Sequence, residues 1–303
     1  MRKYVISLLG VIGTLTCIGL FVHAPSFPTP DKILIFLVFV FMIFNQAWTM
    51  FKKLGPFILI LLAYDSFRSF VPSLNKHVHY TLMPNFDKLL FGTLPTMTLQ
   101  RWLWHGYVTW YDYLFYIFYM LHFVLSIGLA VIIFKIRENE YWRFAMTYIV
   151  ASFAAFAVFL LYPTAPPWLA SQNGYIPHIT RISSEVYSSL GITNFPSIYN
   201  KFAPNPVAAV PSLHTTFSIL FVLFTFKIFG KKWGALSLIY PAMIIFGVVY
   251  MGEHYFFDVV CGAVLAVVAY LTTPYLMKWS LPWLILIRTK IINISIKLRA
   301  KTV

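Results

Sequence analysis

The sequence predicts an all-α fold, a polytopic helical bundle that spans a membrane. Of its 303 residues, 60% are hydrophobic and only 11% are charged. Folded in water, such a chain would leave most of its apolar surface exposed. The apolar residues are also grouped into long runs, and about 18 or more consecutive apolar residues cross roughly 30 Å of hydrocarbon as a helix. The bilayer is therefore the expected solvent.

Eight apolar runs are the expected spans, although the sixth is short. They cover residues 4–22, 33–51, 54–71, 113–134, 144–162, 214–229, 233–251 and 255–277. The first run follows Arg2 and Lys3, as a signal peptide would. It is longer than a usual signal core, and Pro25 would follow the cleaved bond, so we interpret it as a retained span.

Lys and Arg residues divide unequally between the two sides of this expected bundle. With the N-terminus inside, inner segments hold sixteen of the 23 cations and outer segments hold seven. Cytoplasmic loops normally carry the excess, so both termini are expected in the cytoplasm. The net charge of +14 then favours anionic lipids as partners. Nucleic acid is not an expected partner because the cations form no single stripe. No oligomeric state is predicted.

Three segments do not fit as spans. Residues 72–112 combine prolines and charges with Trp and Tyr residues, which favour the headgroup level, so one or two interfacial helices are expected there. Residues 163–211 are rich in Pro, Ser, Asn and Gly, and so long a connection is usually functional. We expect an extracytoplasmic loop over a site. The sequence from Leu281 predicts a basic amphipathic helix on the cytoplasmic surface.

Two histidine motifs each open an apolar run, Pro211-Ser212-Leu213-His214 and His254-Tyr255-Phe256-Phe257-Asp258. In the expected topology the fifth span ends at the outer face, and the sixth and eighth spans both enter from that face. The two motifs and the segment after residue 162 should therefore meet on one side of the membrane.

The spacing within these motifs suits phosphoryl chemistry. His254 and Asp258 are four residues apart, which places them on one face of a helix. The carboxylate can then accept the Nδ1 hydrogen and leave Nε2 free to attack phosphorus. His214 at a helix start can protonate the leaving oxygen, and the positive end of that helix favours phosphate. The alternative is that both histidines only hydrogen-bond neighbouring helices.

These motifs resemble the type 2 phosphatidic acid phosphatase superfamily of lipid phosphatases and phosphotransferases. Its Pro-Ser-x-His motif matches Pro211 to His214, and its Gly-x-His-Tyr-x-x-Asp motif matches Gly252 to Asp258. The resemblance implies that His254 becomes phosphohistidine, that Asp258 orients it, and that His214 protonates the leaving group.

The departures from the superfamily pattern point to one branch. Many members carry a Ser-Arg pair where this chain has Gly247 and Val248, and the Lys-x6-Arg-Pro motif is absent. The inositol phosphorylceramide synthase-like branch lacks these cations and carries Tyr-Pro-Thr-Ala-Pro-Pro-Trp, which matches residues 162–168. Residues 87–92, Asp-Lys-Leu-Leu-Phe-Gly, and the 64–68 end of the third run are also similar to this branch.

Candidate substrate-binding residues surround the expected site. Arg68 is the first choice, because an unpaired guanidinium at the end of a span is costly. The others are Ser212, Tyr255, Tyr162, Pro166, Trp168, Asp112, His122 and Lys201. Several have structural alternatives: Asp112 can cap the fourth span instead of pairing with Arg68, His122 can bond a neighbouring carbonyl instead of lining a cavity, and the Pro-rich element can be a rigid corner.

Nothing in the sequence predicts a metal or another cofactor. There is no His-Glu-x-x-His run and no acidic cluster of the type that holds magnesium. Cys17 and Cys261 both lie inside expected spans, which favours packing roles.

We therefore divide the chain into a two-span N-terminal extension (1–53), a catalytic bundle (54–277) and a basic cytoplasmic tail (278–303). The expected function is a metal-independent membrane lipid phosphatase or phosphotransferase that acts on a lipid phosphate or phosphodiester headgroup. Transfer to a lipid alcohol, as the branch implies, is the alternative to hydrolysis. A lipid transporter or lipid-binding membrane protein is the alternative from another class.

Overall fold

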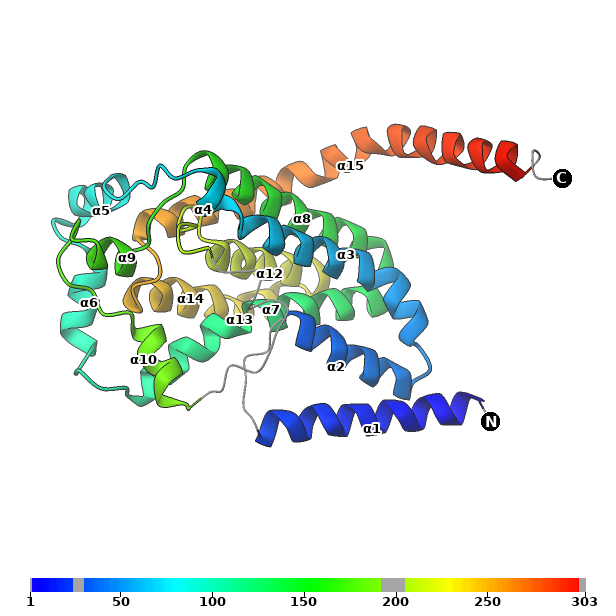
Figure 1. Ribbon diagram of the computed structural model, residues 1–303, viewed down its shortest axis with the longest axis horizontal. Coiled ribbons are helices and arrows are strands. Elements are labelled where there is room, and N and C mark those ends of the chain that lie inside the picture. Colours follow the sequence, from blue (N-terminus) through cyan, green and yellow to red (C-terminus); the bar gives the residue numbers. More distant parts are fainter. Residues whose placement is uncertain (1, 24–29, 192–204, 300–303) are drawn as a thin grey trace.

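The computed structural model describes residues 2–23, 30–191 and 205–299, and it is almost entirely helical (Figure 1). Within these ranges no strand forms, and the extended pairing is limited to two isolated bridges, His79 with Thr164 and Thr164 with Ala208. The all-α prediction is confirmed. Both bridges include Thr164, which lies in the long connection that leads to the first histidine motif.

Long apolar helices make up most of the molecule. They are α1 (Arg2–His23), α2 (Pro30–Ile43), α3 (Ala47–Arg68), α7 (Trp110–Ile136), α8 (Glu138–Leu161), α12 (Leu213–Phe229), α13 (Lys231–Ser237), α14 (Ile239–Tyr250) and α15 (Phe256–Arg299). Among the described residues, five helical segments are long and apolar enough to cross a membrane, and six if the bent α7 is one span. A membrane-spanning bundle is confirmed, but the count of eight spans is not, because α2 and α12 are shorter apolar helices.

Two helix boundaries differ from the expected runs. The run 33–51 breaks at Asn45, which adopts a left-handed conformation with φ of 54°, and residues 47–51 begin α3. Asn tolerates this conformation better than most residues with a Cβ. The run 233–251 divides into α13 and α14 at Leu238. Pro241, three residues later, has no N–H to donate to the Ser237 carbonyl, so a continuous helix would lose a bond there.

Aromatic side chains fill the core between α3, α8 and α12. Phe144 lies at its centre, 4.5 Å from Tyr148, 5.0 Å from Phe224 and 6.1 Å from Phe57 between ring centroids. All four rings are fully buried. Tilted and edge-to-face pairs of this kind add to the stabilisation from apolar burial. α12, which carries the first histidine motif, is therefore packed against this aromatic core.

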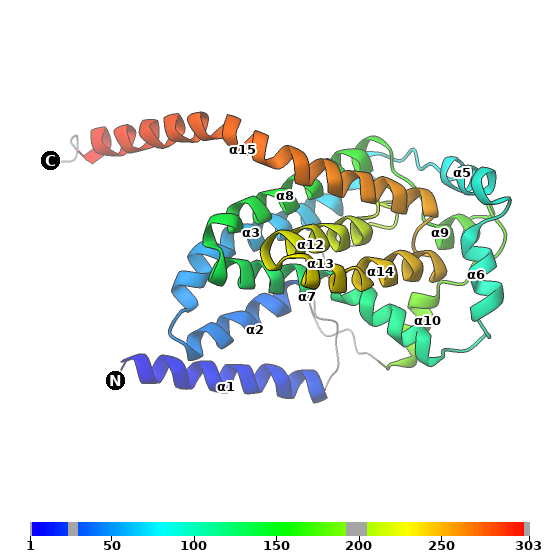
Figure 2. The same cartoon turned by 180° about the vertical axis from the view of Figure 1, so that it is seen from behind.

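Short helices gather at one end of the bundle (Figures 1 and 2). They are α4 (Val71–Leu74), α5 (Leu82–Phe91), α6 (Pro95–Leu103), α9 (Pro167–Gln172) and α10 (Ile182–Ser189). α5 and α6 fall in the 72–112 segment, where one or two interfacial helices are expected. α9 and α10 lie in the long connection 163–211, for which no helix was predicted. The chain thus covers this end with short elements.

The start of α1 and the far end of α15 both lie toward the opposite end (Figures 1 and 2). Ion pairs at helix ends join Lys53 to Glu138 at 2.6 Å and Lys227 to Glu140 at 3.2 Å. Such partly exposed pairs add little stability. They bring Lys53 and Lys227, two cations of the expected inner segments, to the start of α8. α15 continues as a helix to Arg299, which covers most of the expected tail helix.

Candidate active site

The two histidine motifs meet at the end of the bundle that carries the short helices. Nδ1 of His214 lies 3.4 Å from Nε2 of His254. Nδ1 of His254 lies 3.3 Å from Oδ2 of Asp258. Asp258 is fully buried and His254 is 6% exposed. The carboxylate therefore holds Nδ1 of His254 as the protonated nitrogen, and Nε2 faces the second histidine with its lone pair.

Asp258 reaches His254 in a different way from the expected one. α15 begins at Phe256, so His254 lies in the connection before the helix and Asp258 in its first turn. Oδ2 of Asp258 also accepts the backbone N–H of Tyr255 at 2.9 Å. The carboxylate thus caps the helix that carries it and positions the histidine at the same time.

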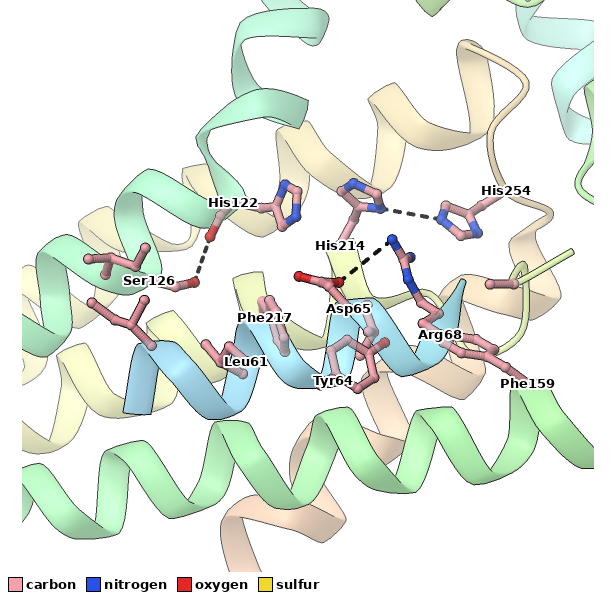
Figure 3. Close-up of a pocket in the computed structure, with 14 residues that line it drawn as sticks. Leu61, Tyr64, Asp65, Arg68, His122, Ser126, Phe159, His214, Phe217 and His254 are labelled. Carbon is pink, nitrogen blue, oxygen red and sulfur yellow. Dashed lines mark hydrogen bonds and ion pairs between the residues drawn. The ribbon is translucent and has the colours of Figure 1, made fainter. Parts of the chain in front are cut away.

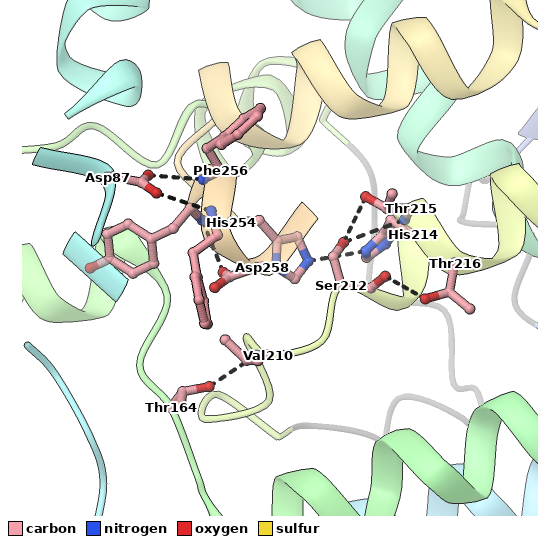
Figure 4. A network of polar contacts seen from close by, with 12 residues as sticks. Asp87, Thr164, Val210, Ser212, His214, Thr215, Thr216, His254, Phe256 and Asp258 are labelled. Atoms are coloured by element: carbon pink, nitrogen blue, oxygen red, sulfur yellow. Dashed lines mark hydrogen bonds and ion pairs between the residues drawn. The ribbon is translucent and has the colours of Figure 1, made fainter. Parts of the chain in front are cut away.

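α12 presents His214 in its first turn. Ser212 is the residue before the helix, and its hydroxyl oxygen accepts from the Thr215 backbone N–H at 3.4 Å and the Thr215 hydroxyl at 3.2 Å. The Ser212 N–H donates to the Asp258 carbonyl at 3.0 Å, which ties the two motifs together. Ser212 is fully buried. Ser212 therefore caps α12 through its side chain and links α12 to α15 through its backbone N–H (Figure 4).

A close backbone approach fixes the junction between α12 and α15. A Cβ placed on Gly262 would lie 2.4 Å from the Ser212 carbonyl oxygen. The Thr216 hydroxyl donates to the Gly262 carbonyl at 2.9 Å. Only a residue without a side chain allows this distance, so Gly262 sets the separation of the helices that carry the two histidines.

Asp87 supports the start of α15 from outside the bundle. Its carboxylate accepts the N–H groups of Phe256 and Phe257 at 2.9 and 3.0 Å. Burial raises its pKa to about 6, with the nearby Asp258 adding to the rise and the two backbone N–H groups opposing it. Asp87 begins the 87–92 element that is similar to the synthase-like branch, which gives that element a role in placing His254.

A cavity of about 130 Å³ lies beside the histidine pair (Figure 3). It runs between α3, α7 and α12. His214, His254, Arg68, Asp65 and His122 line its polar part. Nη2 of Arg68 is 3.7 Å from Oδ1 of Asp65. The structure therefore brings the predicted Arg68 and His122 to the histidine pair, and it adds Asp65.

The ring of His214 is packed on both sides. It stacks on Tyr119 with a centroid distance of 4.2 Å, and the ring of His122 meets it at 4.4 Å and 61°. Nδ1 of His122 lies 2.9 Å from the Tyr119 carbonyl. His122 thus has both roles that the sequence left open, since it bonds a neighbouring carbonyl and lines the cavity.

A second polar cluster braces the connection before His254. Glu253 pairs with Arg181, with Nε of Arg181 2.9 Å from Oε1, and it also accepts the Ser183 hydroxyl. The Arg181 guanidinium lies 4.1 Å above the Trp168 ring. Burial opposes the positive charge of Arg181, but the Glu253 carboxylate outweighs it and raises the pKa of the guanidinium. Trp168, Arg181 and Glu253 therefore form a packed unit at the end of the bundle that carries the short helices.

Several predicted substrate-binding residues do not line the cavity. Asp112 caps α7 through Thr109 and accepts the Tyr250 hydroxyl at 2.6 Å, so it takes the capping alternative and does not pair with Arg68. Tyr162 stacks on His79 at 3.6 Å. Four more do not line the cavity: Ser212 at the α12 cap, Pro166 at the start of α9, Trp168 against Arg181, and Tyr255 in an apolar cluster.

Tyr255 and Lys201 complete the set of predicted residues. The Tyr255 side chain is 1% exposed and packs against Met83 and Leu94. Burial, with the nearby carboxyl groups of Asp258 and Asp87, raises the pKa of its phenol above the usual value. Lys201 lies outside the described residues. Within the described ranges, no three His, Cys, Asp or Glu residues are grouped as a metal site would require.

Sequence reasoning missed Asp65, the helix-capping role of Asp87, and Tyr119. A signal for Asp65 existed, because a carboxylate inside a predicted span is costly and is usually functional. Asp87 was noted only as part of a similar element. Tyr119 had no signal, since an aromatic residue within an aromatic-rich span is indistinguishable from core packing.

Comparison with known proteins identifies the family. The model of the PAP2 superfamily matches residues 86–272. The chain belongs to the PAP2 superfamily. This confirms the lipid phosphatase or phosphotransferase class that the histidine motifs predicted. The match includes both motifs and ends before the tail. It does not include α3, which contributes Asp65 and Arg68.

Two proteins that are similar to this chain are named as synthases. The chain is 30% identical to a phosphoinositol dihydroceramide synthase of Bacteroides thetaiotaomicron over 241 residues, 74% of this chain and 76% of that protein. It is 25% identical to an inositol phosphorylceramide synthase of Candida albicans over 218 residues, 64% of this chain and 42% of that protein. No solved structure gives a significant match. The resemblance to the inositol phosphorylceramide synthase-like branch is confirmed.

The geometry explains how this PAP2 protein differs from the common superfamily pattern. Val248, where many members are expected to carry Arg, is fully buried in an apolar cluster with Ile244 and Tyr240. Gly247 faces Phe115, whose Cβ would lie 3.3 Å from an added Cβ. A cation at 248 would be buried among apolar side chains. Arg68 of α3 lines the cavity together with the two histidines.

Proposed function

We propose that this protein transfers a phosphoinositol headgroup from a phospholipid to a lipid alcohol of the ceramide type, through a phosphohistidine on His254. The observation that carries the proposal is the 3.4 Å contact between His214 and His254 beside a cavity that contains Arg68. The names of the two synthases supply the headgroup and the acceptor.

The first half of the reaction forms the phosphohistidine. Nε2 of His254 attacks phosphorus, the bond from phosphorus to the diacylglycerol oxygen breaks, and protonated His214 gives its proton to that oxygen. Asp258 stabilises the imidazolium that develops on His254. Arg68 binds the phosphate oxygens as the phosphate-binding cation of the site.

The second half reverses the roles. The hydroxyl of the acceptor loses its proton to neutral His214 and attacks phosphorus, and the bond from phosphorus to Nε2 breaks. Two in-line displacements retain the configuration at phosphorus. If water takes the place of the lipid alcohol, the same residues hydrolyse the headgroup, so hydrolysis is the second candidate activity.

The active site is proposed to face the extracytoplasmic or lumenal side, with both termini in the cytoplasm. The excess of cations in the inner segments supports this orientation. The start of α1 and the far end of α15 share the end of the bundle away from the short helices, as the proposal requires (Figure 2).

Product analysis tests the proposed reaction. Purified full-length protein in detergent is incubated with phosphatidylinositol and ceramide, and the products are identified by mass spectrometry. The expected products are diacylglycerol and a new phosphoinositol lipid in equal amounts. Free inositol phosphate with no new lipid would show hydrolysis instead, and intact substrates would contradict both activities.

The variant His254→Ala distinguishes an enzyme from a lipid transporter or lipid-binding protein. It should abolish product formation by the enzyme while the purified variant still folds. A transporter with the same change would keep most of its transport activity, because movement of a lipid needs no nucleophile. The matched control is His105→Ala, which removes an imidazole from the connection between α6 and α7, away from the cavity.

A further inference from the structure

The cavity extends beyond the histidine pair toward the interior of the bundle. Its far part is lined by apolar side chains of α3, α7 and α12, including Leu61, Ile127 and Phe217, and by Ser126. Figure 3 shows Leu61 and Ser126 on the side away from His254. A molecule that fills this cavity therefore meets polar groups at one end and hydrocarbon at the other, as a lipid alcohol does.

The polar part of the cavity is rich in hydrogen-bond acceptors. Asp65 is 6% exposed and carries a carboxylate within a membrane span, which is costly unless it has a function. Its contact with Arg68, at 3.7 Å, is longer than a charge-assisted hydrogen bond and leaves the carboxylate with acceptor capacity. His122 donates its Nδ1 hydrogen to the Tyr119 carbonyl, so its Nε2 is an acceptor.

The reaction geometry places the phosphate beside Arg68 and the lipid alcohol, rather than the inositol, in the rest of this cavity. In two successive in-line displacements at Nε2 of His254, the leaving and entering oxygens occupy the same position opposite that nitrogen. His214 must reach this oxygen to move its proton. The cavity adjoins His214 and continues into the apolar interior, so it meets both requirements for the place that the two lipid alcohols would occupy in turn.

We propose that this cavity is the site of the lipid alcohol, and that Asp65 with His122 selects an acceptor that carries a second hydrogen-bond donor beside its reacting hydroxyl. An amide N–H or a second hydroxyl is such a donor. Diacylglycerol has only the one hydroxyl and lacks it. This inference rests on the proposed transferase activity. It assigns to Asp65 and His122 the preference for a ceramide-type acceptor over diacylglycerol, the alcohol released in the first half of the reaction.

The variant Asp65→Asn tests the selection of the acceptor. It keeps the shape of the side chain but replaces the carboxylate, which can accept at both oxygens, with an amide. Transfer of the phosphoinositol group to short-chain ceramide is compared with its transfer to short-chain diacylglycerol. We expect kcat/KM for ceramide to fall about 10- to 100-fold, the loss of one hydrogen bond to a charged group, and that for diacylglycerol to change less than about threefold.

Asp112→Asn is the matched control, since it also removes a buried carboxylate from the bundle but at the α7 cap. It should lower both rates in parallel and leave their ratio unchanged. An equal loss with both acceptors in Asp65→Asn, or no loss, would overturn the proposal. Failure of the proposed function would give a different result, because the wild-type protein would then transfer the headgroup to neither alcohol.

A second pair of variants covers the case in which Asp65→Asn does not fold. Ser126 and Ser152 are both buried and both donate to the carbonyl four residues earlier, at 2.6 and 2.8 Å, but only Ser126 lines the cavity. Ser126→Val should lower transfer to ceramide at least fivefold more than Ser152→Val does. Equal effects of the two variants would contradict an alcohol site in this cavity.

Discussion

His254 and Asp258 show how far residue spacing alone predicts a site. The four-residue interval predicted their contact, and the carboxylate does meet Nδ1 at 3.3 Å. The expected helical geometry was wrong, because His254 precedes the helix. The contact survives because Asp258 caps the helix start and reaches back to the connection. The four-residue interval therefore predicted the contact between the two side chains correctly. It did not predict the backbone conformation at His254, which depends on how the start of α15 is capped.

Asp258→Asn tests the role of this carboxylate. The amide keeps the shape but can present its N–H₂ to Nδ1, which favours the tautomer with a protonated Nε2 and removes the nucleophile. We expect kcat to fall by about 10²- to 10⁴-fold with little change in the KM for phosphatidylinositol. Steady-state kinetics measure the change. A loss confined to KM would assign Asp258 to substrate binding instead.

Residues that depend on partners far away in sequence could not be predicted. Asp65 and His122 lie on different helices, and their meeting with His214 requires the packing of α3, α7 and α12. For Asp112, the sequence favoured a helix cap and an ion pair with Arg68 equally. In the structure Asp112 caps the helix, because Thr109 and Tyr250 are nearer partners.

The junction of α12 and α15 is the element that positions the chemistry. Gly262→Ala adds a methyl group where the Ser212 carbonyl oxygen is 2.4 Å away, so the two helices must separate. We expect a loss of about 1–3 kcal/mol in stability and a larger fractional loss of activity than of folded protein. Thermal unfolding and turnover are measured on the same preparation.

Gly128→Ala is the control for Gly262→Ala, because an added Cβ at Gly128 meets nothing within 4 Å. This helical site should gain up to about 1 kcal/mol from the higher helix propensity of Ala, with activity unchanged. Wild-type activity in Gly262→Ala would show that the spacing of the two helices does not control the histidine contact.

Asp87 at the start of α15 gives a dependence of stability on pH. Its pKa is raised from about 4 to about 6 in the folded protein. The folded state then binds the proton more tightly than the unfolded state, so this group contributes most stability below about pH 4 and loses it as pH rises through 6. The unfolding temperature of wild type relative to Asp87→Asn should therefore fall between pH 4 and 6.5.

That difference between wild type and Asp87→Asn should stay constant above about pH 7, where the carboxyl is ionised in both states. Glu138→Gln, which removes an exposed partner of Lys53 at the other end of the bundle, is the control. A difference that rises with pH through this window would mean that Asp87 is stabilised as an anion in the folded protein.

The apolar runs predicted where helices form, but they did not predict where those helices break. All eight runs are helical in the described residues, because a long apolar segment must satisfy its backbone internally in hydrocarbon. The break at Asn45 lies inside one run and that at Leu238 inside another, where a local backbone preference or a missing N–H acts within a continuous apolar pattern. α9 and α10 carry too few periodic apolar positions to be recognised.

At the scale of the whole molecule, ion pairs lie at both ends of the bundle, and Arg68–Asp65 and Arg181–Glu253 are the pairs near the histidines. Basic helix ends and ion pairs such as Lys227 with Glu140 lie away from the histidine pair, which the short helices cover. The division of cations predicts an orientation as well, because loop charges control orientation during insertion, and that orientation stays a prediction. The number of spans could not be predicted, since hydropathy does not show whether the short α2 and α12 cross the bilayer alone.

Labelling of single cysteines tests the orientation. With Cys17 and Cys261 replaced by Ser, a membrane-impermeant maleimide is added to intact spheroplasts of cells that express Tyr175→Cys or Lys232→Cys. Cys at the exposed position 175 should react at once, and Cys at 232 only after permeabilisation. The reverse pattern would place the active site on the cytoplasmic side.

The most direct test of the central claim is a search for phosphate on His254. Purified protein is mixed with phosphatidylinositol labelled with ³²P, without acceptor, quenched in alkali and digested for mass spectrometry. The account predicts an alkali-stable, acid-labile phosphoinositol group on the His254 peptide in wild type and none in His254→Ala, with release on addition of ceramide. Full transfer activity without any such adduct, or an adduct on a residue other than His254, would contradict it.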